Sequence, residues 1–190
     1  GDYEMFDREG LKNLVYSAVL LALALALPFL TGQIPEIGNA LCPMHIPVLL
    51  CGFVCGPLPA AVVGGAAPLL RSLMFGRPVL FPNALCMAFE LAAYGLAAGL
   101  LNKRLPERPG YVYLSLSLSM IFGRLVWGGV SYIIYALGGM DFTFGMFTAG
   151  ALFNAVPGII IQIVLIPPVV WGLRRAGVIC SNAKASVHGD

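Results

Sequence analysis

Long apolar segments make up most of this chain and restrict it to folds that a lipid bilayer can accommodate. Of its 190 residues, 59% are hydrophobic and only 11% are charged, with a mean hydropathy of +0.88. A soluble domain carries about 25% charged residues. Because each helical crossing takes about 20 apolar residues, the chain has room for five to seven transmembrane helices and no separate soluble domain.

Six apolar runs predict an all-α integral membrane protein with six transmembrane helices in one domain, residues 10–175. The runs are residues 14–30, 45–56, 57–75, 80–101, 112–137 and 148–173. The second run is too short to cross straight unless its neighbours cover it. Gly56-Pro57-Leu58-Pro59 predicts a tight turn after it. Residues 1–9 and 176–190 are predicted as flexible cytoplasmic termini.

The basic residues predict the orientation of these helices. With six spans, both termini lie on one side, and eight of the eleven Lys and Arg residues fall on that side: Arg8, Lys12, Lys103, Arg104, Arg108, Arg174, Arg175 and Lys184. Loops rich in Lys and Arg stay in the cytoplasm. The sequence therefore predicts a multi-pass membrane protein with both termini in the cytoplasm.

Several functional classes find no support in the sequence. There is no GxxxxGK[ST] loop, so hydrolysis of a nucleotide in the P-loop manner is excluded. The net charge of +2 is too small to suggest nucleic acid as a partner. The five cysteines show no metal-binding spacing and are predicted as buried free thiols. We therefore expect neither a metal site nor a cofactor.

Three charged residues, Arg71, Glu90 and Arg124, lie inside predicted spans. A charge at the bilayer centre costs at least about 2.5–3.5 kcal/mol. Counting residues from the helix ends places Glu90 and Arg124 near mid-depth, so we predict an ion pair between them at the floor of a cavity. The alternative is a pair that only joins two helices. Arg71 either meets a carboxylate or phosphate of a ligand or snorkels to the outer surface.

Further polar and aromatic residues share helical faces with this pair and complete the candidate substrate-binding set. The full set is Arg71, Asn83, Glu90, Arg124, Trp127, Tyr135, Asn154 and His45. Trp127 and Tyr135 either stack on a ligand ring or pack in the core. His45 either lines the cavity or is a neutral histidine bonded to a loop carbonyl. The polar stripes are expected to converge inside the bundle, since lipid disfavours them.

Small residues form a ridge on the first helix. Ala18, Ala22 and Ala26 repeat at intervals of four residues and therefore share one face. Such ridges let helix backbones approach closely in a membrane. The ridge is predicted either to pack within the bundle or to dock a partner protein.

The stretch from Met44 to Pro57, MHIPVLLCGFVCGP, resembles the second helix of the substrate-binding S components of energy-coupling factor (ECF) transporters, which carry an xIPVLLxGxxxGP pattern. The following Gly64-Gly65 and the region from Pro68 to Arg71 are similar to the third helix of that family. With six spans, cytoplasmic termini and an alanine ridge, the resemblance covers about residues 10–175.

The resemblance implies a membrane receptor of an ABC-type importer that binds a vitamin or related micronutrient from outside. It implies a transmembrane coupling subunit and two cytosolic ATPases as partners, and toppling of the receptor in the membrane as the transport step. The family's AxxxA motif, which contacts the coupling subunit, maps onto Ala18 and Ala22, and Ala26 extends it. The ligand stays open. Arg71 and Arg124 favour a carboxylate such as pantothenate or a folate, whereas Glu90 suits amide or amine donors such as a pyrimidine or deazapurine; a cobalamin is a further option.

Two other functions compete with this interpretation. A self-sufficient secondary transporter or channel would often show internal repeats, and we find no convincing repeat between residues 14–101 and 112–173. An intramembrane enzyme would use Glu90 and His45 as acid and base. We expect these two residues to be too far apart, because His45 opens a helix near the outer face while Glu90 lies mid-depth. The chain is therefore not expected to be an enzyme.

Overall fold

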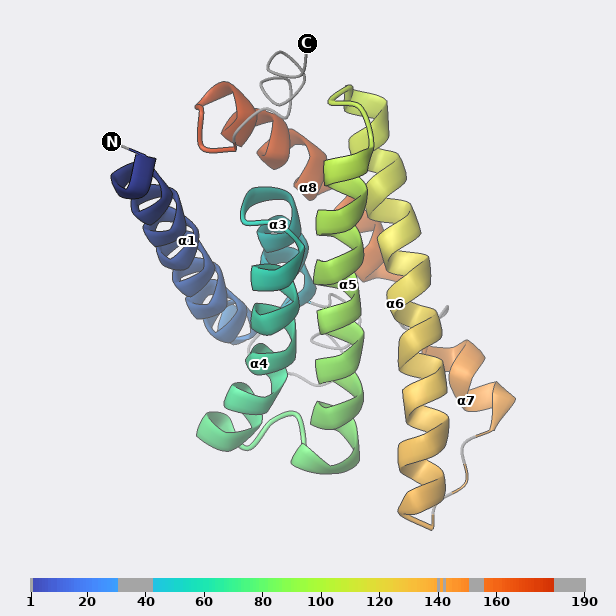
Figure 1. The fold of residues 1–190 in the computed structure, drawn as a ribbon. Helices are drawn as coiled ribbons and strands as arrows, with labels where there is room; N and C mark the ends of the chain where they lie inside the picture. Colours follow the sequence, from blue (N-terminus) through green and yellow to red (C-terminus); the bar gives the residue numbers. More distant parts are fainter. Residues whose placement is uncertain (1, 31–42, 140, 142, 151–155, 180–190) are drawn as a thin grey trace.

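The computed structural model describes residues 2–30, 43–139, 141, 143–150 and 156–179. In this part of the chain all regular structure is helical (Figure 1). The elements are α1 (Asp2–Leu30), α3 (His45–Val54), α4 (Pro57–Phe75), η1 (Leu80–Ala84), α5 (Leu85–Arg104), α6 (Pro109–Leu137), α7 (Phe144–Thr148) and α8 (Val156–Arg175). Five spans are long and apolar enough to cross a membrane: Gly10–Phe29, Pro57–Phe75, Leu80–Arg104, Pro109–Leu137 and Val156–Arg175.

The second predicted span is a half-length helix. With ten residues, α3 is about 15 Å long, half the thickness of a hydrocarbon core. Pro47 lies in its first turn, where a missing N–H is tolerated. The helix ends before Gly56, whose φ of +93° suits glycine, and Pro57 then begins α4. The prediction of six spans is therefore not confirmed; the described helices provide five candidate spans and this shorter one.

Of the last predicted span, residues 148–173, the structure describes 148–150 and 156–173. Thr148 ends the five-residue helix α7, and residues 156–173 lie in the long helix α8. The hydroxyl of Thr143 accepts a hydrogen bond from the Met146 amide at 3.3 Å and caps α7.

Helix α5 is central, with α4 on one side, α6 on the other, and α3 also in contact (Figure 1). Glycines allow the close approach of α4 and α5. A Cβ atom added at Gly95 would lie 2.5 Å from the Ala60 carbonyl oxygen, and one at Gly99 would lie 2.5 Å from the Pro57 nitrogen. Packing through small residues is typical of membrane helices. It fixes α4 firmly against the helix that carries Glu90.

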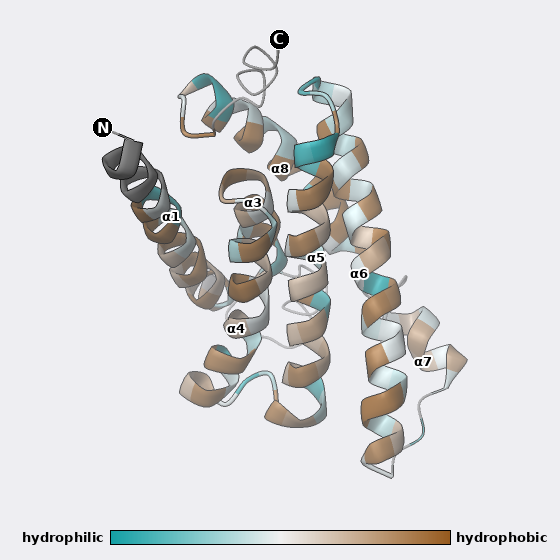
Figure 2. Cartoon of the chain, in the orientation of Figure 1, coloured by the Kyte–Doolittle hydropathy of each residue, from teal (hydrophilic) through white to brown (hydrophobic). Residues whose placement is uncertain are grey.

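One end of the bundle gathers the basic residues, and we call it the basic end. It carries Lys12 near the start of α1, Lys103 and Arg104 at the end of α5, Arg108 before α6, and Arg174 and Arg175 at the end of α8. Figure 2 shows hydrophilic residues concentrated there and apolar residues along the middle of the helices. Arg174 Nη2 donates to Asn102 Oδ1 at 2.6 Å, and Asn102 Nδ2 donates to the Phe53 carbonyl at 3.3 Å. Asn102 therefore joins α3, α5 and α8 at this end.

Candidate functional site

The predicted ion pair between Glu90 and Arg124 is present in the structure. Arg124 Nη1 on α6 lies 2.8 Å from Glu90 Oε1 on α5. The Glu90 side chain is 2% exposed and that of Arg124 is 16% exposed. A carboxylate and a guanidinium at this distance stabilise each other strongly when water is excluded. The depth argument from the sequence was therefore right about the pair, while the cavity above it stays a prediction.

His45 lies beside this pair, and the prediction that it is too far from Glu90 was wrong. Its Nε2 atom is 3.6 Å from Glu90 Oε1, and its ring meets the Tyr94 ring edge-on with centroids 5.2 Å apart. The error came from assuming that the second helix starts at the outer face. Because α3 is only half-length, its first residue lies at the depth of Glu90 instead.

Polar atoms in this cluster lack protein partners. Neither ring nitrogen of His45 has a hydrogen-bond partner within the described residues, although the side chain is 4% exposed. Glu90 Oε1 lies 2.8 Å from Arg124 Nη1 but likewise has no hydrogen-bond partner within the described residues. A buried polar atom without a partner costs about 1–3 kcal/mol. On α8, Oε1 of the buried Gln162 also has no hydrogen-bond partner within the described part of the chain.

Polar residues continue from the ion pair along the contact between α5 and α6, in what we call the polar seam. Cys86, one turn before Glu90 on α5, and Ser131 on α6 are both buried. At the end opposite the basic end, the Tyr135 hydroxyl donates to Asn83 Oδ1 at 3.4 Å. Asn83 is exposed. The seam therefore links the buried pair to the surface at that end.

Trp127 packs against protein rather than facing an open space. Its ring stacks on Phe147 of α7, with centroids 6.1 Å apart and an angle of 23° between the planes. A Cβ atom at Gly150 would lie 2.6 Å from the indole ring, which shows how closely the chain after α7 covers it. This contact favours the packing alternative for Trp127. Asn154, another member of the predicted set, lies outside the described residues.

Arg71 does not join the cluster, and its buried side chain does not snorkel to the outer surface, while its contact with a ligand carboxylate or phosphate stays a prediction. Its side chain is buried on α4, and Nη1 donates to the Leu25 carbonyl of α1 at 2.6 Å. The guanidinium carbon lies 4.9 Å from the Phe29 ring centroid and 5.4 Å from that of Phe75. Cation–π contacts and a charge-assisted hydrogen bond together account for a buried arginine. Arg71 fastens α1 to α4.

The alanine ridge faces outward. Ala18, Ala22 and Ala26 are all exposed, whereas Ala24 on the other face of α1 is fully buried against α3 and α4. Only 6% of the apolar window of α1 is buried, the smallest share of the five candidate spans. Of the two predicted roles of the ridge, packing within the bundle is not seen among the described residues, because all three alanines are exposed.

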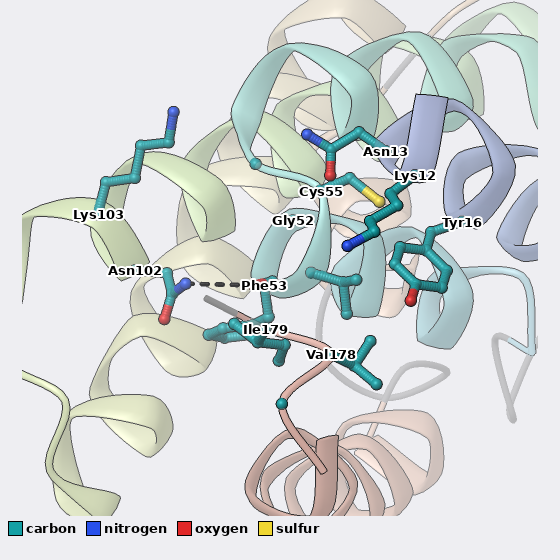
Figure 3. Close-up of a pocket in the computed structure, with 13 residues that line it drawn as sticks. Lys12, Asn13, Tyr16, Gly52, Phe53, Cys55, Asn102, Lys103, Val178 and Ile179 are labelled. Atoms are coloured by element: carbon teal, nitrogen blue, oxygen red, sulfur yellow. Dashed lines mark hydrogen bonds between the residues drawn. The ribbon is translucent and has the colours of Figure 1, made fainter. Parts of the chain in front are cut away.

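Sequence reasoning missed a pocket of about 250 Å³ at the basic end. Its lining includes Lys12 and Tyr16 of α1, the end of α3, and Asn102 and Lys103 of α5. Figure 3 shows the Asn102 amide bonded to Phe53 on one side and Lys12 and Tyr16 on the other. The polar Asn102 near the end of an apolar helix was the available signal. This pocket lies at the other end of α5 from Asn83.

Among the described residues, no group of three or more His, Cys, Asp or Glu side chains is arranged to hold a metal ion. The arrangement at Glu90 instead offers hydrogen bonds and charge to a small organic molecule. A model of the family described as "ECF transporter, substrate-specific component" matches residues 12–170. Searches of curated proteins and of solved structures gave no match.

Proposed function

The chain belongs to the substrate-specific components of ECF transporters, and we propose that it is the high-affinity membrane receptor that captures a water-soluble vitamin or related micronutrient from outside. The family match over residues 12–170 is the observation that carries the proposal. Members of this family are transporter subunits and not enzymes, so the proximity of His45 and Glu90 is interpreted as recognition rather than acid–base catalysis.

The ligand site that we propose is centred on Glu90, Arg124 and His45. Buried ionisable residues in a membrane protein face a binding site or a pathway more often than lipid. This cluster lies near mid-depth between three helices, and the His45 nitrogens have no hydrogen-bond partner in the described part of the chain. The polar seam to Asn83 and Tyr135 supports access from the end opposite the basic end.

The orientation that fits this route places the basic end in the cytoplasm. Lys12, Lys103 and Arg174 lie near one another at that end, as the positive-inside rule requires of a cytoplasmic surface. Asn83 then faces the outside, in a bacterial cytoplasmic membrane. This orientation can be tested by placing a cysteine at Asn83 or at Lys103 and labelling whole cells with a membrane-impermeant thiol reagent. Labelling at position 83 alone is expected, and labelling at position 103 alone would indicate the opposite orientation.

Uptake in this family needs a coupling module with ATPases, and we propose a transmembrane coupling subunit and two cytosolic ATPases as the partners. The exposed Ala18, Ala22 and Ala26 supply a smooth face on a weakly buried helix, which suits helix-to-helix docking. Replacing Ala22 by Leu is expected to abolish co-purification with the coupling subunit while leaving ligand binding intact. The control is Val19→Ala, since Val19 lies on the exposed surface of α1. Ala24→Leu would not serve as a control because Ala24 is buried.

Native mass spectrometry of the purified chain tests the receptor function directly. We expect a co-purified small molecule whose mass identifies it, and its loss in Glu90→Gln. Purified protein that carries no small molecule and is stabilised by none of a panel of vitamins and nucleobases in thermal-shift assays would contradict the proposal. Ion-driven uptake by the chain alone in liposomes would instead support a self-sufficient transporter.

A further inference from the structure

The pocket at the basic end carries positive charge and no acidic side chain. Lys12 of α1 and Lys103 of α5 lie on opposite sides of it (Figure 3). Asn13, Tyr16 and Asn102 add polar groups, and none of the described residues that line the pocket is Asp or Glu. Lysine and tyrosine side chains donate hydrogen bonds. The pocket, about 250 Å³ in volume, therefore suits an anionic group that accepts hydrogen bonds.

A third cation lies behind the pocket wall. Arg174 of α8 donates through Nη2 to Asn102 Oδ1 at 2.6 Å, and its Nη1 atom is buried with no hydrogen-bond partner among the described residues. In the described part of the chain, none of Lys12, Lys103 and Arg174 forms a salt bridge. Like charges gathered at one end without acidic partners repel one another. An anion in the pocket would offset that repulsion.

The pocket lies at the depth of phospholipid phosphates. Lys12 is near the start of the candidate span Gly10–Phe29, and Lys103 is next to the last residue of the span Leu80–Arg104. The hydrocarbon core gives way to the headgroup region where such spans end. Basic pockets between transmembrane helices on the cytoplasmic side bind the head groups of anionic lipids.

An apolar strip on α1 leads from the pocket toward the bilayer centre, and we call it the acyl strip. Val15, Val19 and Leu23 follow Lys12 at offsets of 3, 7 and 11 residues, so they share a helical face with it. All three side chains are exposed. At 1.5 Å per residue the strip extends about 16 Å from Lys12. A free phosphate would leave this strip unused, whereas the acyl chain of a lipid would lie along it.

We propose that the pocket at the basic end binds the phosphate group of an anionic phospholipid whose acyl chain lies along the acyl strip. Lys12 and Lys103 contact the phosphate from two sides, and the Tyr16 hydroxyl donates a hydrogen bond to it. This site is separate from the proposed ligand site, because Glu90 lies twelve residues, or about 18 Å, from Asn102 along α5. The inference does not depend on which vitamin the chain binds.

Native mass spectrometry of the full chain in detergent with added lipid tests the site. Dioleoylphosphatidylglycerol, which is anionic, is compared with dioleoylphosphatidylcholine, which has the same phosphate and acyl chains but no net charge. We expect the first phosphatidylglycerol to bind about 10- to 30-fold more tightly, since each lysine near a membrane surface contributes about a fivefold preference for anionic lipid. Lys12→Gln/Lys103→Gln should reduce this ratio to about twofold or less.

Arg104→Gln/Arg108→Gln is the matched control. It removes the same charge from the same end of the bundle, at two exposed residues that do not line the pocket. It should largely keep the preference for phosphatidylglycerol. An equal loss of preference in both double variants would overturn the pocket as the site, because general surface charge would then account for the binding.

Three further outcomes would also overturn the inference. Equal binding of the two lipids to the unmodified chain would remove its basis. Displacement of bound phosphatidylglycerol by inorganic phosphate would assign the pocket to a soluble anion. Loss of co-purification with the coupling subunit in Lys12→Gln/Lys103→Gln, with an unchanged lipid preference, would assign the pocket to protein docking. Vitamin binding is measured separately, so failure of the lipid site leaves the receptor function standing.

Discussion

Neutralising Glu90 alone should destabilise the bundle far more than neutralising Glu90 and Arg124 together. The two charges lie 2.8 Å apart, with side-chain exposures of 2% and 16%. At an effective dielectric constant near 20, unit charges at this distance attract by about 6 kcal/mol. Removal of one partner from a buried pair typically costs about 3–5 kcal/mol, since the other charge is left unpaired.

The double variant Glu90→Gln/Arg124→Gln leaves no charge unpaired, and its two amides can hydrogen-bond to each other. We therefore expect it to lose less than about 2 kcal/mol of unfolding free energy. Each single variant should lose about 3–5 kcal/mol, so the two effects are strongly non-additive. Equilibrium unfolding by SDS in mixed micelles, followed by circular dichroism without added ligand, measures the three values.

Tyr135→Phe is the matched control for this cycle, because it removes a longer and more exposed seam contact, the 3.4 Å bond to Asn83. It should cost about 1 kcal/mol or less. Single variants as stable as the double one would refute the ion pair as a coupled structural unit. Additive losses would show instead that the two residues stabilise the fold independently.

Three further changes test the packing around the site. Arg71→Met should lower the free energy of unfolding by about 2–4 kcal/mol and speed amide hydrogen exchange in α1, because one charge-assisted hydrogen bond and two cation–π contacts are lost. Faster exchange in other helices but not in α1 would contradict this. Gly95→Ala should lower stability by about 1–3 kcal/mol in SDS unfolding, whereas Gly129→Ala, which meets nothing within 4 Å, should not. Trp127→Ala should accelerate proteolysis within α7, and an unchanged cleavage pattern would show that its stacking on Phe147 does not hold that helix.

Sequence reasoning worked where a helix is long and uninterrupted. Glu90 and Arg124 lie on such helices, and a fixed rise of 1.5 Å per residue converts sequence position into depth. Their pairing was therefore predictable. The outward face of Ala18 and Ala22 was not, because a small-residue ridge packs equally well against its own bundle or a partner.

Sequence reasoning failed where the answer depends on a distant neighbour. Arg71 donates to the Leu25 carbonyl, 46 positions earlier in the chain. Because every residue has a backbone carbonyl, the sequence does not indicate which one accepts this hydrogen bond. The depth of His45 depends on how far α3 extends from the basic end, which its composition does not reveal. The same holds for the pocket at that end, since residues from four separate segments form it.

The short α3 is the feature that creates the candidate site. Its C-terminal residue, Val54, lines the same pocket as Lys103 at the basic end, and its ten residues extend only about 15 Å from there. A full-length helix of about 20 residues would carry its first residue about 15 Å further, to the opposite surface and away from Glu90. The shortness of α3 therefore brings His45 within 3.6 Å of the buried Glu90 carboxylate and edge-on against the Tyr94 ring, although the three residues lie on different helices or at different positions along them.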